Sequence, residues 1–371
     1  MRVALVHEWL QAYAGSEKVL AAFAELYPDA PIHTLVHEPA GFKGTPLEGR
    51  EVHTTALQHV PGGRRFRPAF LPWMPGLIET LDVRGAEVVL SSSHCVAKGV
   101  LTRADQLHIS YVHSPMRYAW DLTHAYVDSL TGVKALARPM VRRQLHKLRQ
   151  WDALSALRVD DFLANSKTVA KRIAKTYRRE AAVVYPPVEV DRFDATQTRE
   201  GFFLLVSRMV PYKQVEAVVE AFALNGEELV VIGDGPGMAR CKSLSSGKAN
   251  IKLLGAAGDA VVADHMARCK AFVFAADEDF GITPVEAMAS GAPVVALSRG
   301  GTGETVLEGV TGVHFDEQNA RAIADAVSIF LRRAGDFDSA AIRRHAEGFS
   351  RERFLEEIRR HVAGAWERFS Q

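Results

Sequence analysis

Short apolar runs alternate with stretches of helical periodicity along the whole chain. The first run, Arg2–His7, favours a strand, and Ser16–Leu26 then places its apolar residues at helical spacing. Further apolar runs lie at 86–91, 108–113, 164–166, 182–185, 202–206, 229–232, 251–254, 271–274 and 293–296. Strands that alternate with helices in this way predict an α/β fold with mostly parallel sheets.

The alternation stops and starts afresh near the middle of the chain. Pro186-Pro187 ends the first series of strands, and a second series begins after Gly201. We therefore expect two Rossmann-like domains, residues 1–190 and 191–353, with a C-terminal helix at about 354–371 that packs back on the first domain. Ligands of open parallel sheets bind outside the carboxyl ends of the strands, so two facing sheets would leave a binding cleft between them.

The composition is that of an ordinary globular protein. The 371 residues are 47% hydrophobic and 24% charged with a formal net charge of +1, which excludes disorder as the main state. No apolar stretch reaches about 18 residues, and the apolar start of the chain is too short for a signal peptide, so we expect a cytoplasmic protein. Three widely spaced cysteines predict neither a disulfide framework nor a zinc site. A sequence pI of 7.8 disfavours a nucleic-acid partner.

The richest candidate chemistry follows the run 271–274. Three acidic residues, 277–279, lead into a helix that we expect to begin near Pro284, because proline suits the first helical position. The backbone amides that would point out of this helix start belong to Gly281, Ile282 and Thr283. A helix start of this kind binds anions, phosphate especially.

Two glutamates flank this helix start and allow other interpretations. Glu278 precedes it, and Glu286 could face a hydroxyl-bearing group attached to the bound phosphate. Alternatively, Glu286 completes a capping box with Thr283 and has only a structural role. A further alternative is that Asp277 and Asp279 hold a divalent metal ion, since carboxylates suit Mg²⁺.

Cations and small residues at other strand ends add to the picture. Arg208 follows the run 202–206 and Lys213 lies five positions on, a pair suited to clamp a diphosphate or to remain on the solvated surface. Gly15 and Ser16 open a helix near the first strand, where Ser16 could be a phosphate contact or only an N-cap. His113 ends the run 108–113 and is either a catalytic group or a hydrogen-bonded core residue.

Two basic stretches mix cations with large apolar side chains. One is Arg64–Met74, and the other places Arg138, Arg142 and Arg149 close to one helical face. Such stretches can dock at an anionic membrane surface, although a solvated helix face accounts for them equally well.

The order of these features resembles that of the retaining glycosyltransferases of family 4, which have the GT-B architecture of two facing Rossmann-like domains. The resemblance covers nearly the whole chain, from Gly15-Ser16-Glu17 and His113 to Ser207-Arg208 with Lys213 and the E-x(7)-E motif of Glu278 and Glu286. The stretches 112–121 and 278–288 are similar to the subgroup of O-antigen and exopolysaccharide mannosyltransferases, which implies GDP-mannose as the donor.

The resemblance also implies roles for individual residues. The implied catalytic residues are His113, Glu278, Arg208 and Lys213. The diphosphate leaving group would be stabilised by Arg208, Lys213 and the amides at the helix start, without a metal or another cofactor. The residues implied to contact the donor are Gly15, Ser16, Arg208, Lys213, Gly255, Ala256, Glu278, Phe280, Gly281, Ile282, Thr283 and Glu286. Among them, Glu286 would hold the ribose hydroxyls, Glu278 the sugar, and the loop 254–257 the nucleobase.

The implied acceptor is a glycan or a polyprenyl-diphosphate-linked saccharide in cell-surface polysaccharide synthesis, reached from the cytoplasm at the inner face of the plasma membrane. Three alternatives stay open at this point. They are a UDP-sugar donor in the same reaction, a nucleotide-sugar 2-epimerase, and a catalytically silent sugar-binding protein.

Overall fold

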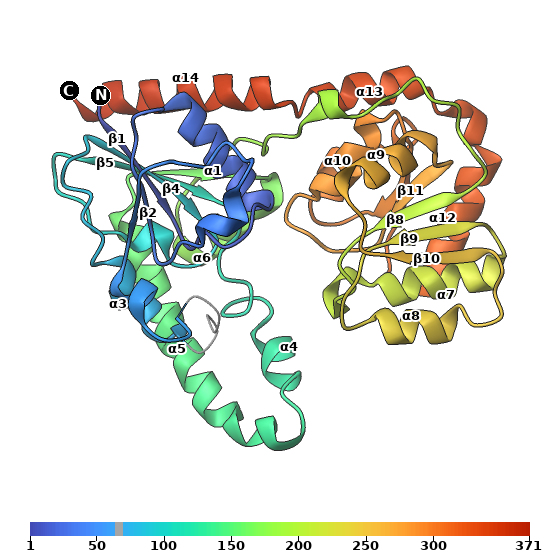
Figure 1. Cartoon of the computed structure of the whole chain (residues 1–371), viewed down its shortest axis with the longest axis horizontal. Coiled ribbons are helices and arrows are strands. Elements are labelled where there is room, and N and C mark those ends of the chain that lie inside the picture. Colours follow the sequence, from blue (N-terminus) through green and yellow to red (C-terminus); the bar gives the residue numbers. More distant parts are fainter. Residues whose placement is uncertain (64–69) are drawn as a thin grey trace. The chain divides into compact units, whose positions relative to one another are not determined.

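Two parallel sheets, each covered by helices, organise the chain (Figure 1). The computed structural model describes residues 1–63 and 70–371, which divide into a first unit of Met1–Tyr185 with Leu355–Gln371 and a second unit of Pro186–Phe354. The predicted α/β class with two Rossmann-like sheets is confirmed. The first division falls at Tyr185 rather than at residue 190, and the last helix begins at Arg351 rather than near residue 354.

The sheet of the first unit has the strand order β3-β2-β1-β4-β5-β6-β7, and its paired strands are all parallel. Its strands are β1 (Val3–His7), β2 (Ile32–Thr34), β3 (Val52–Thr54), β4 (Val88–Ser93), β5 (Leu107–Val112), β6 (Asp161–Ala164) and β7 (Ala182–Val183). The helices of this unit are α1 (Gly15–Leu26), α3 (Met74–Ile78), α4 (Thr123–Asp128), α5 (Arg138–Ser155) and α6 (Lys167–Tyr177), with most of α14 (Arg351–Phe369).

The sheet of the second unit is also parallel, with the order β10-β9-β8-β11-β12-β13. Its strands are β8 (Phe203–Val206), β9 (Leu229–Ile232), β10 (Ile251–Gly255), β11 (Ala271–Phe274), β12 (Val294–Leu297) and β13 (Gly312–Phe315). Its helices are α7 (Val215–Asn225), α8 (Met238–Leu244), α9 (Asp259–Arg268), α10 (Ile282–Ala289), α11 (Thr302–Thr305), α12 (Ala320–Arg332) and α13 (Ser339–Glu347).

Central strands of both sheets are apolar because helices cover the two faces of each sheet (Figure 1). In the second unit, Phe203, Val231, Val273 and Val295 belong to one buried cluster with residues of α7 and α12. Continuous apolar runs are typical of such strands, which is why most of them could be located from the sequence.

A buried ion pair fixes α5 to the sheet of the first unit. Lys98 donates to the carboxylate of Asp152, and both side chains are almost completely buried. The same carboxylate accepts hydrogen bonds from Trp120 Nε1 at 2.7 Å and from Tyr177 Oη at 3.0 Å, while Ser155 Oγ accepts from Lys98 at 2.8 Å. With these partners the buried charges are paired and hydrogen-bonded, as burial of charge requires.

The boundary between the two units passes through α14. Within the first unit, this helix buries the apolar side chains of Ile358, Val362 and Ala365, and His361 Nε2 lies 2.9 Å from a carboxylate oxygen of Asp161.

None of the helices in the described ranges is both long and apolar enough to cross a membrane.

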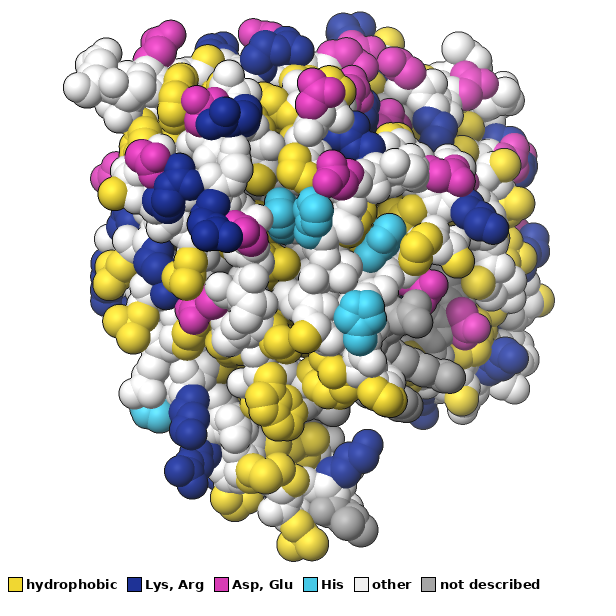
Figure 2. All heavy atoms as spheres, turned by 60° about the vertical axis from the view of Figure 1, so that its left-hand side comes forward, with side chains coloured by type: hydrophobic (Ala, Val, Ile, Leu, Met, Phe, Trp, Pro, Cys, Tyr) yellow, Lys and Arg dark blue, Asp and Glu magenta, His cyan; other side chains and the backbone are white. Residues whose placement is uncertain are grey.

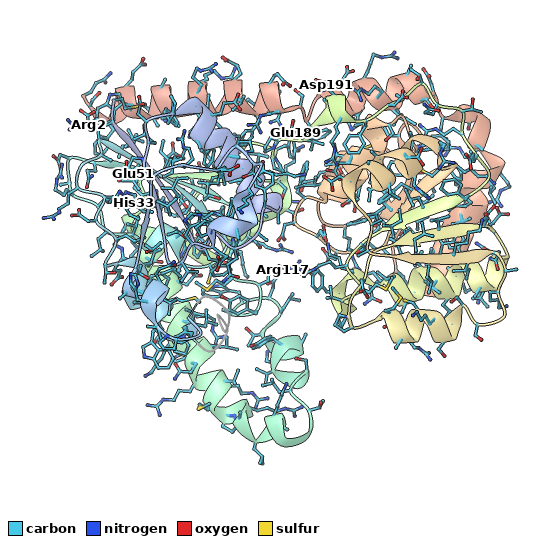
Figure 3. The ribbon with its side chains drawn as sticks, viewed as in Figure 1. Arg2, His33, Glu51, Arg117, Glu189 and Asp191 are labelled. Atoms are coloured by element: carbon cyan, nitrogen blue, oxygen red, sulfur yellow. The ribbon has the colours of Figure 1, made fainter. Side chains whose placement is uncertain are left out.

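Ion pairs inside the second unit hold the segment that follows Tyr185. Arg351 at the start of α14 lies 3.1 Å from the carboxylate of Glu189, and Arg343 of α13 lies 3.2 Å from that of Asp191 (Figure 3). Arg343 also donates to the carbonyl oxygens of Val190 and Phe193, so this segment is tied to α13 by its backbone as well.

Candidate functional site

Loops at the carboxyl ends of β8, β9 and β10 are joined by main-chain hydrogen bonds. The Ser207 N–H donates to the Ile232 carbonyl at 3.0 Å, Met209 N–H to that of Asp234 at 2.9 Å, and Gly233 N–H to that of Gly255 at 2.8 Å. A β-carbon on Gly233, whose φ is 138°, would collide with the Ser207 carbonyl oxygen. Glycine at this position therefore allows the two loops to touch, which gives the second unit a firmly connected edge.

This edge carries a pocket of about 540 Å³. Its lining combines cations, main-chain turns and small apolar side chains, and the lining residues are Val206, Ser207, Arg208, Lys213, Ile232, Gly233, Asp234, Ala256, Ala257, Val262 and Thr283. The pocket thus lies outside the carboxyl ends of parallel strands, where open α/β sheets bind their ligands.

Lys213 is not a solvated surface cation. Its side chain is 18% exposed and its ammonium group contacts the carboxylate of Glu278. Burial and the neighbouring Arg208 lower the pKa of Lys213 from 10.5 to about 8, while the contact with Glu278 favours the charged form. Arg208 itself is exposed at the pocket wall. The two predicted cations are therefore brought together in one pocket.

The helix start beside the pocket differs from the sequence-based expectation. Helix α10 begins at Ile282 with Gly281 as its N-cap, at φ 80°, so Pro284 is the third helical residue and not the first. Thr283 and Glu286 then occupy the second and fifth helical positions, which are not the N-cap and third positions of a capping box. The capping-box alternative is wrong, because the left-handed glycine starts the helix earlier than proline chemistry suggests.

The other predicted residues around α10 have different surroundings. Glu286 is buried, with a carboxylate oxygen 3.8 Å from Arg192 Nη2. The Glu278 carbonyl accepts a hydrogen bond from Gly301 N–H at 2.8 Å. The ring of Phe280 is buried and packs on Phe349, so its side chain belongs to the core of the second unit and only its main chain is left for a ligand.

The predicted residues of the first unit lie at the carboxyl ends of β1 and β5. Ser16 is not the N-cap of α1, because Ala14 holds that position and the Ser16 hydroxyl donates to Glu17 at 3.0 Å. His113 Nε2 lies 2.8 Å from Ser92 Oγ, and burial beside His94 and His7 lowers the pKa of His113 from 6.5 to about 3. His113 is therefore a neutral imidazole at physiological pH.

Three residues at the two edges were not predicted from the sequence. Val262 lines the pocket of the second unit beside Asp234, a polar residue that the pattern of strand ends does indicate, and His7 and Ser92 surround His113 in the first unit. His7 ends the first predicted strand, so its position at a carboxyl end was a usable signal. Val262 gave no signal, because an apolar residue on a helix is normally assigned to the core.

No cluster of three or more His, Cys, Asp or Glu side chains suited to hold a metal ion is found in residues 1–63 and 70–371. This applies to Asp277 and Asp279 as it does to the rest of the described chain.

The two basic stretches divide unevenly. Residues 64–69 of the stretch Arg64–Met74 lie outside the described residues, and Trp73 in its described part is 62% exposed. Arg138 and Arg149 donate to backbone carbonyls around α4, so of the three predicted helix cations Arg142 is the exposed one. Figure 2 shows cationic and apolar side chains next to one another on the lower part of this face.

Comparisons with known proteins agree with this geometry. Residues 189–345 match the family model "Glycosyl transferases group 1". One curated relative is a D-inositol 3-phosphate glycosyltransferase of Geodermatophilus obscurus, which is 29% identical over 54% of this chain and 51% of its own length. Another is a GDP-mannose-dependent mannosyltransferase of Mycobacterium tuberculosis that acts on phosphatidylinositol monomannoside. It is 30% identical over 45% of this chain and 51% of its own length. The chain thus spans about half the length of these relatives.

Solved structures extend the likeness to nearly the whole chain. The Anabaena protein Alr3699/HepE, in complex with UDP, has a TM-score of 0.74 at 16% identity over 98% of this chain and all of its own. Sucrose-phosphate synthase of Thermosynechococcus elongatus has a TM-score of 0.75 at 14% identity over 98% of this chain and 99% of its own.

Two parallel sheets with a pocket at the carboxyl edge of the second give the chain the GT-B architecture that these solved structures share. The segment 189–345, which lies in the second unit, is similar to the group 1 glycosyl transferases.

Proposed function

We propose that this protein transfers a hexose from a nucleotide sugar to a saccharide acceptor with retention of configuration at the anomeric carbon. The observation that carries the proposal is the pocket that unites Arg208, Lys213 and Thr283 at the start of α10. Breaking the bond between the sugar and the diphosphate leaves negative charge on the departing oxygens. Two cations and the free amides of a helix start are suited to stabilise that charge.

In this proposal each part of the donor has its own partners, some of them in the pocket and others outside its lining. The nucleobase lies against Ala256, Ala257 and Val262, where the lining is apolar. The ribose hydroxyls bind the carboxylate of Glu286, and Glu278 orients the sugar. His113, at the carboxyl edge of the first sheet, contacts the donor sugar as a neutral group.

Retention follows from the same arrangement if the acceptor attacks from the side of the leaving group. In that reaction the departing diphosphate takes the proton of the acceptor hydroxyl as the new glycosidic bond forms. The protein then contributes position and charge stabilisation rather than a covalent nucleophile.

We further propose GDP-mannose as the donor. The support is the resemblance of stretches 112–121 and 278–288 to mannosyltransferases, together with the mannosyltransferase among the relatives. UDP is the nucleotide in the related Anabaena structure, so a UDP-sugar is the competing donor.

Thermal unfolding in the presence of a panel of nucleotide sugars tests this choice. A ligand that binds only the folded state at a hundred times its Kd stabilises the protein by about 2.7 kcal/mol. We expect GDP-mannose to raise the melting temperature more than UDP-glucose or UDP-galactose, and to be consumed when a saccharide acceptor is added. A larger shift with a UDP-sugar would replace the donor, and binding without turnover on any acceptor would favour a silent sugar-binding protein. Conversion of the donor to its 2-epimer would identify an epimerase.

The surface around α5 supports a location at a membrane. Its exposed side chains combine the apolar Leu136 and Met140 with the cations Lys134, Arg142, Arg143 and Lys147. We propose that this surface binds anionic lipid, which would bring a polyprenyl-diphosphate-linked acceptor within reach. Each cation near such a surface contributes about 1 kcal/mol.

Co-sedimentation with vesicles tests the membrane proposal. The protein should sediment with phosphatidylglycerol-containing vesicles and less with phosphatidylcholine vesicles, and Arg142→Ala with Arg143→Ala should weaken the binding. Arg359→Ala on the exposed side of α14 is the matched control. Equal binding by the double variant and the parent would disprove the role of this surface.

A further inference from the structure

Three side chains of the first unit, those of Glu17, His7 and Ser92, lie in line behind His113. A carboxylate oxygen of Glu17 lies 3.5 Å from His7 Nε2, and His7 Nδ1 lies 3.1 Å from Ser92 Oγ. The same hydroxyl lies 2.8 Å from His113 Nε2. His7 and Ser92 are completely buried and the Glu17 side chain is 7% exposed, so these contacts are shielded from water.

The backbone holds each member of this chain in place. His7 and Ser92 are paired residues of the neighbouring strands β1 and β4. The main-chain N–H of His113 donates to the Ser93 carbonyl at 2.8 Å. Glu17 is fixed at its other oxygen, which accepts from Ala14 N–H at 3.2 Å and from Ser16 Oγ at 3.0 Å. The chain therefore runs from the turn before α1 to His113.

We propose that Glu17, His7 and Ser92 are positioning residues that determine which ring nitrogen of His113 carries the proton. The contact of that nitrogen with the donor sugar rests on the proposed function. Ser92 links the protons of the two rings, because a hydroxyl has one proton and can donate to only one of its two histidine partners.

Two arrangements of protons satisfy the chain. When His7 is neutral with its proton on Nε2, facing Glu17, its Nδ1 accepts from Ser92. Ser92 then accepts from His113 Nε2–H, and His113 offers Nδ1 as an acceptor. When the proton of His7 lies on Nδ1, His7 donates to Ser92, which donates to His113 Nε2. The proton of His113 then resides on Nδ1, and His113 offers a donor.

Other charged groups around His7 are accounted for by contacts of their own. Glu8 is completely buried and accepts from the backbone N–H groups of His94, Cys95 and Ala97 and from Ser93 Oγ. His94 lies 3.2 Å from the other carboxylate oxygen of Glu8, and its ring centroid lies 6.2 Å from those of both His7 and His113. Glu17 is thus the carboxylate in line with the His7 ring nitrogen. Burial lowers the pKa of His113 to about 3, so His113 is neutral at physiological pH in both arrangements.

Nitrogen-15 NMR of the histidine rings in the full chain tests the proposal without any substrate. At neutral pH the carboxylate of Glu17 should keep the proton of His7 on Nε2, and the proton of His113 should therefore lie on Nε2. Ser92→Ala should give a mixture of His113 tautomers, because the hydroxyl between the two rings is lost. Glu17→Gln should move the His113 proton toward Nδ1, because a glutamine amide no longer requires a donor on His7 Nε2. The same His113 tautomer in the parent, Ser92→Ala and Glu17→Gln would overturn the proposal.

Ser91→Ala is the matched control. Ser91 Oγ lies 2.9 Å from His108 Nε2, so this neighbouring strand residue makes an equally buried serine–histidine contact away from His113. Ser91→Ala should leave the His113 tautomer of the parent unchanged. A changed tautomer in Ser91→Ala would show that any cavity in β4 disturbs the His113 ring.

Transfer kinetics then separate this proposal from the proposed function. Ser92→Ala should lower kcat by about tenfold or more, as loss of an outer partner does at metal-bound histidines, without changing the Kd for GDP. Ser91→Ala should keep both values within about twofold, since it leaves the His113 contacts in place. A His113 tautomer that changes in Ser92→Ala while kcat stays unchanged would uphold the link from Ser92 to His113 and remove His113 from the donor sugar.

Discussion

Lys213 shows how one residue can be understood only with its surroundings. From the sequence it is one of 45 Lys and Arg residues and a surface position is the ordinary expectation. In the structure a left-handed Gln214 ends the short turn 211–213, and Lys213 reaches the pocket wall beside Arg208. Tertiary burial cannot be inferred from an isolated lysine, and only the resemblance suggested a position in a pocket for Lys213.

The lowered pKa of Lys213 predicts an alkaline loss of diphosphate binding. A lysine whose pKa falls to about 8 loses its charge as the pH rises through 8 rather than through 10.5. The affinity for GDP measured by calorimetry should therefore fall between about pH 7 and pH 9, as the lysine charge is lost. Lys213→Arg should remove this pH dependence, because guanidinium stays charged throughout. A parent protein with constant affinity across this range would contradict the assignment.

Transfer itself should depend on Lys213 more than folding does. We expect Lys213→Ala to lower the transfer rate by the equivalent of about 2.7–4 kcal/mol, as for loss of one oxyanion donor. Its melting temperature should change little, since the variant also removes a desolvated charge. Lys252→Ala, on the exposed surface of β10, is the control that should change neither quantity. Full activity in a folded Lys213→Ala variant would remove this residue from the leaving-group site.

The carboxylate of Glu286 should affect the binding of the nucleotide. A carboxylate can accept from both ribose hydroxyls, whereas glutamine offers one acceptor oxygen, and charge-assisted bonds are roughly twice as strong as neutral ones. Glu286→Gln should therefore weaken GDP binding in calorimetry. Arg192 keeps Asp259 as a partner at 2.7 Å, so the variant should melt close to the parent. Equal affinity of variant and parent would mean that Glu286 serves only the structure of the second unit.

Elements were easier to predict than their ends. Buried strands such as β9, β11 and β12 were located because burial on both faces makes them continuously apolar. The strands β2 and β3 have three residues each, too few for a pattern to stand out. The start of α10 was displaced because the proline signal is strong in sequence, while the left-handed Gly281 that sets the real start gives no periodicity.

Removal of one partner of the buried ion pair between Lys98 and Asp152 should cause a large loss of stability. Asp152→Ala leaves a buried ammonium without its carboxylate and should lower the free energy of unfolding by about 3–5 kcal/mol. Asp325→Ala, at an exposed position of α12, should change it by no more than about 0.5 kcal/mol. Urea unfolding measures both. Similar values for the two variants would show that the network around Asp152 does not hold α5.

We expect sugar transfer to proceed without an added metal ion. Arg208, Lys213 and the start of α10 provide the positive charge that the diphosphate needs, so transfer should persist after dialysis against EDTA. The assay compares initial rates before and after chelation. Complete loss that Mn²⁺ restores would instead assign Asp277 and Asp279 to a metal, and a requirement for acceptor lipid alone would leave the prediction intact.

The passage of α14 from one unit to the other has a consequence for recombination between related enzymes. A single exchange point near Tyr185 would give a chimera whose last helix comes from one parent and the sheet beneath it from the other. The contacts of Ile358, Val362 and His361 would then be made between unmatched sequences. Exchanging the second unit alone requires two junctions, at Tyr185/Pro186 and at Phe354/Leu355. The second unit is therefore an insertion within the first unit, and it should be inherited or exchanged as one continuous segment.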